Sequence, residues 1–205
     1  MPRRNDIANA LTAGTRIIAC ALLFAGVLRA QSIDIQLAHN SPAEQQTKTQ
    51  LERLLKQYDT SKYTFTQKIV IDESAIPHSD PVLTIHTRHL QQDDELLSTY
   101  VHEQLHWYLD TKKQHTDAAE KELRALYPNP PVGGKEGART LQSDYLHLIV
   151  CKLEWDADRQ LLGDVRAQAV MDFWTKDHYT WVYQTVLADT DKIEAIIKRN
   201  NPDLP

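Results

Sequence analysis

Residues 91–111 read QQDDELLSTYVHEQLHWYLDT, and this stretch decides how the rest of the chain is interpreted. It contains neither proline nor glycine, and its apolar residues recur at helical spacing. The pattern therefore predicts one long α-helix. Asp93 and Asp94 can cap the start of this helix, and the charge of Glu95 suits its N-terminal dipole.

His102, Glu103 and His106 form the pattern H-E-x-x-H within this helix. Positions i and i+4 share one face of a helix, so the two imidazoles can hold one Zn²⁺ ion. Glu103 then stands beside the metal, where it can take a proton from a metal-activated water. The alternative is a solvated helix that carries two histidines by chance, in a chain with nine of them.

A third metal ligand is expected on a second predicted helix, residues 140–162. His147, Glu154 and Asp158 lie on nearly one face of it, because they are spaced by seven and four residues. Three aligned polar residues on an apolar helix are costly unless they are paired or bind a metal. About 10 Å of helix separates His147 from Glu154, so one ion is not expected to bind both. Glu154 is the preferred third ligand, and His147 is the alternative. Otherwise His147 would support a ligand, contact the substrate or be a core histidine bonded to a carbonyl.

H-E-x-x-H followed by E-x-x-A-D-R, which begins at Glu154, resembles the zinc-site motifs of the gluzincin peptidases. The pair is most similar to the motifs of the CAAX-processing-type membrane endopeptidases. The resemblance implies a zinc metalloendopeptidase in which Glu154 is the third ligand and Asp158 orients a zinc-bound histidine. It covers these two helices only, and those endopeptidases are usually multi-pass membrane proteins. Without the resemblance, Asp158 could equally pair with Arg159 or Arg166.

Peptide hydrolysis develops an oxyanion, which a hydrogen-bond donor beside the zinc would stabilise. Residues 177–183 offer His178 and Tyr179 as candidate catalytic donors, with Tyr183 and Tyr145 as further options. Aromatic residues at this spacing also suit a packed core.

The first 30 residues are expected to form a signal peptide or an N-terminal anchor. Arg3, Arg4 and Arg16 precede an apolar run of twelve residues, Ile17–Leu28, which matches a signal sequence and is short for a membrane span. The protein is therefore expected to be exported, to the periplasm or outside the cell. It would contact a membrane only through an uncleaved anchor.

Charge and cysteine content narrow the function further. The segment 1–30 carries four of the 23 basic and one of the 28 acidic residues, so the net charge falls from −5 to −8 without it. This balance argues against a nucleic-acid partner. Cys151 would be the one remaining cysteine, and it is expected to be a small buried hydrophobe; a catalytic thiol is the rival interpretation.

The rest of the chain predicts short elements. We expect an extended or loose segment at 31–40, strands at 63–71 and 82–87, and helices at 42–58, 116–126, 165–174, 180–187 and 191–199. The second strand could present an edge to an extended substrate. Residues 128–137 hold three prolines and three glycines, which favours an irregular loop that is either a connector or a lid.

These observations predict an α+β, zincin-like domain over residues 31–205, with a small N-terminal sheet, a mostly helical remainder and zinc held between two helices. The predicted function is zinc-dependent hydrolysis of a peptide or protein substrate, a cell-wall peptide or another amide being variants of it. The alternative is an exported, non-catalytic zinc-binding module on a peptidase-like scaffold.

Overall fold

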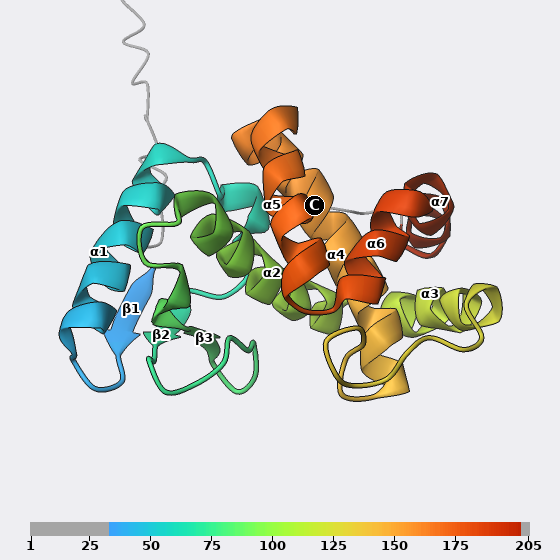
Figure 1. Ribbon diagram of the computed structural model, residues 1–205, viewed down its shortest axis with the longest axis horizontal. Coiled ribbons are helices and arrows are strands. Elements are labelled where there is room, and N and C mark those ends of the chain that lie inside the picture. The colour runs from blue at the N-terminus through green and yellow to red at the C-terminus, as the bar shows by residue number, and fades with distance from the viewer. Residues whose placement is uncertain (1–32, 202–205) are drawn as a thin grey trace, which may run out of the picture. The chain divides into compact units, whose positions relative to one another are not determined.

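A small parallel sheet opens the part of the chain that the computed structural model describes, residues 33–201 (Figure 1). The strands are β1 (Asp34–Leu37), β2 (Lys68–Ile71) and β3 (Leu83–Ile85), and they lie in the order β1-β2-β3. Helix α1 (Pro42–Gln57) carries the chain from β1 to its parallel neighbour β2, as a parallel pair requires.

Helices make up most of the remainder. Helix α4 is central, because it contacts each of α2, α3, α5, α6 and α7. The predicted combination of a small N-terminal sheet with a mostly helical remainder is therefore confirmed. The six helices after the sheet are α2 (Asp93–Thr111), α3 (Lys113–Leu126), α4 (Leu141–Leu162), α5 (Asp164–Asp177), α6 (Thr180–Ala188) and α7 (Thr190–Asn200).

Residues 34–37, expected to be extended or loose, are extended and form β1, because parallel pairing with β2 orders them and buries Ile35. The strand predicted at 82–87 is confirmed as β3, whereas the strand predicted at 63–71 is only partly right, because β2 begins at Lys68. Residues 63–67 are not part of a strand. The buried side chain of Gln104 takes the hydrogen bonds that a neighbouring strand would have made: its Oε1 accepts from the amides of Phe65 (2.7 Å) and Thr66 (2.8 Å), and its Nε2 donates to the Thr66 carbonyl (2.8 Å).

The start of α2 also differs from the prediction. Its N-cap is Gln92, and no side chain caps it. Asp93 and Asp94 lie in the first turn instead, where they tie α2 to other helices: Asp93 accepts from Arg53 of α1 at 2.6 Å, and Asp94 pairs with Arg166 of α5. These acidic residues therefore position α2 and still suit its dipole.

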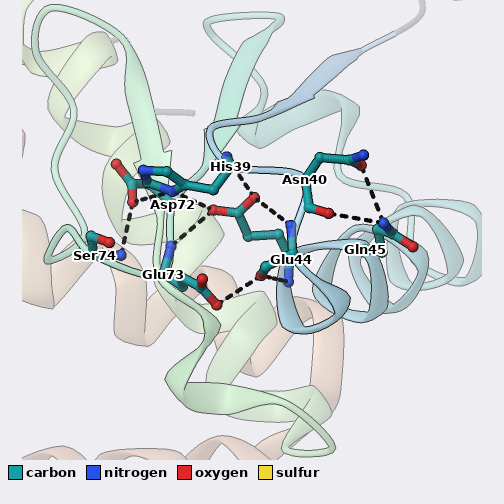
Figure 2. A network of polar contacts seen from close by, with 8 residues as sticks. His39, Asn40, Glu44, Gln45, Asp72, Glu73 and Ser74 are labelled. Atoms are coloured by element: carbon teal, nitrogen blue, oxygen red, sulfur yellow. Dashed lines mark hydrogen bonds and ion pairs between the residues drawn. The ribbon is translucent and has the colours of Figure 1, made fainter.

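Helix α1 is anchored through Glu44, whose buried carboxylate forms the centre of the polar network in Figure 2. Ser41 and Glu44 form a capping box, with Pro42 in the first helical turn. The carboxylate also accepts from the backbone amides of His39 (2.9 Å) and Glu73 (3.2 Å), and from the His39 ring (3.1 Å). These contacts join the end of β1 and the loop after β2 to the start of α1.

Strand β3 lies at one edge of the sheet, as its suggested role in substrate binding requires. Its outer side is partly occupied, because His78 forms an antiparallel bridge with Thr84 through hydrogen bonds of 2.7 and 3.2 Å. The segment around His78 therefore stands between β3 and solvent.

The loop between α3 and α4 is held in place at several points. The amides of Thr180 and Trp181 donate to the carbonyls of Lys135 and Glu136, each at 3.1 Å. A Cβ on Gly137 would lie 1.9 Å from the carbonyl oxygen of Pro131, so only glycine allows this close approach. The loop is thus fastened to the start of α6.

None of the helices described within residues 33–201 is long and apolar enough to cross a membrane. The predicted signal peptide or anchor, residues 1–30, lies outside the described residues.

Candidate metal centre

Helices α2 and α4 bring three histidines together. His102 and His106 share one face of α2, and His147 comes from α4. The Nε2 atoms of His102 and His106 are 3.3 Å apart, and one ring nitrogen from each of the three histidines lies within 4.8 Å of the others. A tetrahedral zinc ion that binds two nitrogens at 2.0–2.1 Å keeps them about 3.3 Å apart. The pair on α2 therefore has the spacing that one zinc ion requires.

The ring of His147 is oriented by its own helix. Its Nδ1 lies 2.7 Å from the Ser143 carbonyl oxygen and 3.2 Å from the Ser143 hydroxyl. A carbonyl only accepts, so Nδ1 is the donor, which leaves Nε2 free as a metal ligand. The structure thus places the alternative third ligand, His147, beside His102 and His106.

Glu154, the preferred third ligand, lies on the other side of His102. Its Oε2 is 2.8 Å from Nδ1 of His102 and accepts from the Tyr183 hydroxyl at 3.0 Å. Its Oε1 accepts from the Ser98 hydroxyl at 2.6 Å. Such a carboxylate holds a metal-binding histidine in one tautomer and one orientation. Glu154 therefore occupies the position that the resemblance implied for Asp158.

Asp158 lies one turn further along α4 and is fully buried. The Ser98 hydroxyl lies beside it but donates its single proton to Glu154, and neither oxygen of Asp158 accepts a hydrogen bond from residues 33–201. Burial and the neighbouring Glu154 raise the pKa of Asp158 well above its usual value. Arg159 and Arg166, its other suggested partners, pair with Asp164 and Asp94 instead.

The protonation states of His106 and His147 suit metal binding. Burial, followed by the charge of His102, lowers the pKa of His106 well below 6.5 and that of His147 to about 3. Both rings are therefore neutral at pH 7, the form that binds metals. Burial also acts to lower the pKa of His102, but the contacts with Glu154 and Cys151 together outweigh it and raise that pKa well above 6.5. His102 must therefore release a proton when it binds a metal.

Glu103 is buried beside the histidines, and burial raises its pKa to about 7. Glu103 and the three histidines line one cavity of about 520 Å³. A carboxylate with a pKa near the working pH can both accept and return a proton. The cavity is large enough to hold part of a peptide beside these groups.

His178 and Tyr179 line the same cavity. The Tyr179 ring centroid is 4.4 Å from that of His147, and its backbone is left-handed, with φ of 48°. A non-glycine residue in this conformation is uncommon and often marks a functional site. Nδ1 of His178 lies 2.7 Å from the Asp177 carboxylate, which orients the ring.

Cys151 is fully buried, as predicted. It lies with Glu154 on the far side of His102, where a ligand atom from each of these three residues is within 4.8 Å of the others. Burial raises the pKa of the Cys151 thiol to about 11, so it stays protonated and is a poor nucleophile or ligand at pH 7.

The supporting residues Ser98 and Ser143 were not identified from the sequence. Each precedes its histidine by four residues, so helical spacing from His102 and His147 is the signal that could have found them. Tyr183, considered only as an oxyanion donor, instead donates to Glu154.

Comparisons of this chain with models of known families, with curated proteins and with solved structures gave no match. The resemblance to the gluzincin peptidases therefore rests on the motif residues alone.

Proposed function

We propose that this protein is a zinc-dependent peptidase. The observation that carries the proposal is the arrangement of His102, His106 and His147 around one point, with Glu103 lining the same cavity. Three protein ligands and an accessible fourth position are typical of catalytic zinc, whereas structural zinc is usually enclosed by four protein ligands.

In this proposal His102, His106 and His147 would hold the Zn²⁺ ion, and Glu154 would fix the orientation of His102. When bound, the ion would lower the pKa of water and polarise the scissile carbonyl. Glu103 would accept the proton of the attacking water and deliver it to the leaving amine. The pKa of Glu103, about 7, suits both steps.

Tyr179 and His178 are the proposed donors to the developing oxyanion. Tyr179 has the stronger support. Its ring contacts that of His147, and its left-handed backbone conformation sets the direction in which the side chain leaves the chain. Tyr183 is assigned a supporting role instead, since its hydroxyl donates to Glu154.

The proposal keeps a zincin-like arrangement, with zinc between two helices, but changes the ligand set that the gluzincin resemblance implied. His147 replaces Glu154 as the third ligand, and Glu154 replaces Asp158 as the partner of a zinc-bound histidine. Both changes are supported by the 2.8 Å contact between Glu154 and Nδ1 of His102, the nitrogen that faces away from His106.

The second candidate is a non-catalytic zinc-binding module. Glu103 favours catalysis over a non-catalytic module. Burying a carboxyl group costs free energy, and a structural zinc site does not need that group. The cavity beside the histidines also favours catalysis, because it leaves room for a substrate next to them.

The test is the Glu103→Gln variant of the full-length protein. We expect it to bind the same amount of zinc as the wild type and to lose at least about 100-fold in kcat on a peptide library, because the general base is gone. Glu95→Gln, a change at the start of the same helix, is the matched control and should leave turnover unchanged.

A chelator should abolish cleavage, and added Zn²⁺ should restore it. Near-normal turnover by Glu103→Gln would remove Glu103 from its role. A wild type that binds zinc stoichiometrically but cleaves no peptide would favour the non-catalytic module.

A further inference from the structure

We propose that Arg139 recognises a carboxylate of the substrate, either the free C-terminus of a peptide or an acidic side chain near the scissile bond. The inference rests on the proposed peptidase function and names a substrate class for the same site. It starts from Arg139 lining the cavity that Glu103 and the three histidines also line.

Two of the other charged groups that line this cavity have partners, and the third, Glu103, makes no ion pair with Arg139 within residues 33–201. Arg88 pairs with Asp177 at 2.6 Å, and Glu154 accepts from His102, Ser98 and Tyr183. Within residues 33–201, by contrast, no hydrogen bond or ion pair engages the guanidinium of Arg139. The solvent-exposed rim of the cavity therefore carries a cation that no protein group pairs with in this part of the chain.

The backbone on both sides of Arg139 is fixed. The buried Ala138 donates its amide to Asp144 Oδ1 at 2.5 Å, and its carbonyl accepts from Gly133 at 2.7 Å. On the other side Thr140 caps α4 by accepting from the Ser143 amide at 3.1 Å. The side chain thus starts from a defined point at the wall of the cavity.

A guanidinium offers paired N–H donors that match the two oxygens of a carboxylate. A substrate carboxylate is therefore the group that would complement Arg139. A peptide amide in the same position would gain no charge complementarity.

The experiment uses the full-length, zinc-loaded protein and three acetylated tetra-alanine probes. One has a free C-terminus, one is amidated, and one is amidated with an aspartate in place of one alanine. Cleavage is measured as kcat/KM and binding is measured separately by calorimetry. The variants are Arg139→Gln, Arg139→Lys and, as the matched control on the same loop, Lys135→Gln.

We expect the wild type to prefer at least one carboxylate probe to the neutral probe by about 10-fold, the scale of a charge-assisted hydrogen bond. Arg139→Gln should abolish this preference and leave the neutral probe unchanged, Arg139→Lys should retain part of it, and Lys135→Gln should retain all of it. A preference for the free C-terminus alone identifies an exopeptidase subsite, and a preference for aspartate alone identifies a side-chain subsite.

Equal binding of all three probes by the wild type would overturn the proposal. So would a preference that survives in Arg139→Gln, because the metal would then be holding the carboxylate. If the preference in binding depends on Arg139 but no probe or library peptide is cleaved, the carboxylate site stands and the peptidase function fails.

Discussion

At the scale of single residues, the choice between His147 and Glu154 decides the chemistry of the site. Both lie on one face of α4, so spacing along the sequence could identify the face but could not choose between them. The choice depends on where α4 crosses α2, which is set by packing over the whole domain. Local spacing was sufficient for His102, Glu103 and His106, because all three belong to one helix.

Three variants separate a ligand from a residue that supports a ligand. His147→Ala should reduce zinc affinity the most, by more than about 100-fold, because it removes a ligand. Glu154→Gln should reduce it by about 10- to 100-fold, the usual effect of removing a carboxylate that orients a ligand. Asp158→Asn should change it little, because Asp158 contacts no histidine through a hydrogen bond.

Competition with a chromogenic chelator measures these dissociation constants. A larger loss from Glu154→Gln than from His147→Ala would return Glu154 to the ligand position. A large loss from Asp158→Asn would support the role that the gluzincin resemblance implied.

Gln104 shows that a residue inside the H-E-x-x-H pattern can serve the fold. It is fully buried and makes three hydrogen bonds to the backbone of Phe65 and Thr66. Gln104→Leu removes the partner of two amides and one carbonyl in a part-buried segment, at a cost near the lower end of the range of about 1–3 kcal/mol for each group. We therefore expect the free energy of unfolding to fall by about 3 kcal/mol or more.

Urea denaturation followed by circular dichroism measures this loss. Gln57→Leu is the control, because Gln57 is exposed at the end of α1 and should give a change within about 0.5 kcal/mol. Equal effects of the two substitutions would contradict the structural role of Gln104.

At the scale of elements, the helices and β3 were largely predictable, whereas the pairing of β1 and the start of β2 were not. Periodic apolar residues located the helices to within a few residues, since each helix needs only its own sequence to show its buried face. The sequence around β1 leaves an extended and a loose segment equally open, because β1 is four residues long and is ordered by its pairing with β2. The segment before β2 was assigned to a strand because its composition favours one, whereas Gln104 supplies its hydrogen bonds.

The start of α1 gives a prediction on pH. Burial raises the pKa of Glu44, but the hydrogen bonds from His39, Glu73 and Ser41 outweigh it and lower that pKa from 4.5 to about 2. Since the pKa is lower in the folded state, Glu44 stabilises the protein above pH 4.5, and this contribution is lost as the pH falls toward 2.

Glu44→Gln should therefore destabilise the protein at pH 7 and flatten the decline in stability between pH 4.5 and 2. Chemical denaturation at a series of pH values measures both effects. Glu52→Gln, at an exposed position of the same helix, should show the same decline in stability between pH 4.5 and 2 as the wild type. An unchanged acid decline in Glu44→Gln would contradict this assignment.

At the scale of the whole described domain, the apolar core does not require a metal. Buried side chains run through it from Ile35 of β1 to Ile197 of α7, and they include Tyr100, Tyr145 and Tyr183. The candidate zinc site lies at one cavity beside this core. The fold should therefore survive removal of the metal and lose only the free energy of binding.

A chelator should leave the far-ultraviolet circular dichroism unchanged and lower the Tm. Compared with the protein at a free zinc concentration of 100 times the Kd, the free energy of unfolding falls by about 2.7 kcal/mol. This corresponds to a decrease in Tm of about 5–10 °C for a domain of this size. His147→Ala should show little response to zinc under the same conditions. Complete unfolding on chelation would instead indicate that zinc is needed to form the fold.

The attachment of the α3–α4 loop to the start of α6 allows the motion of this loop to be measured by hydrogen exchange. The first amides of a helix normally have no partner within it, yet those of Thr180 and Trp181 are bound by carbonyls of the loop that also carries Arg139. Their exchange with deuterium requires the loop to leave α6. The exchange rates of these two backbone amides therefore report how often the loop separates from α6, and the measurement needs no label in the cavity.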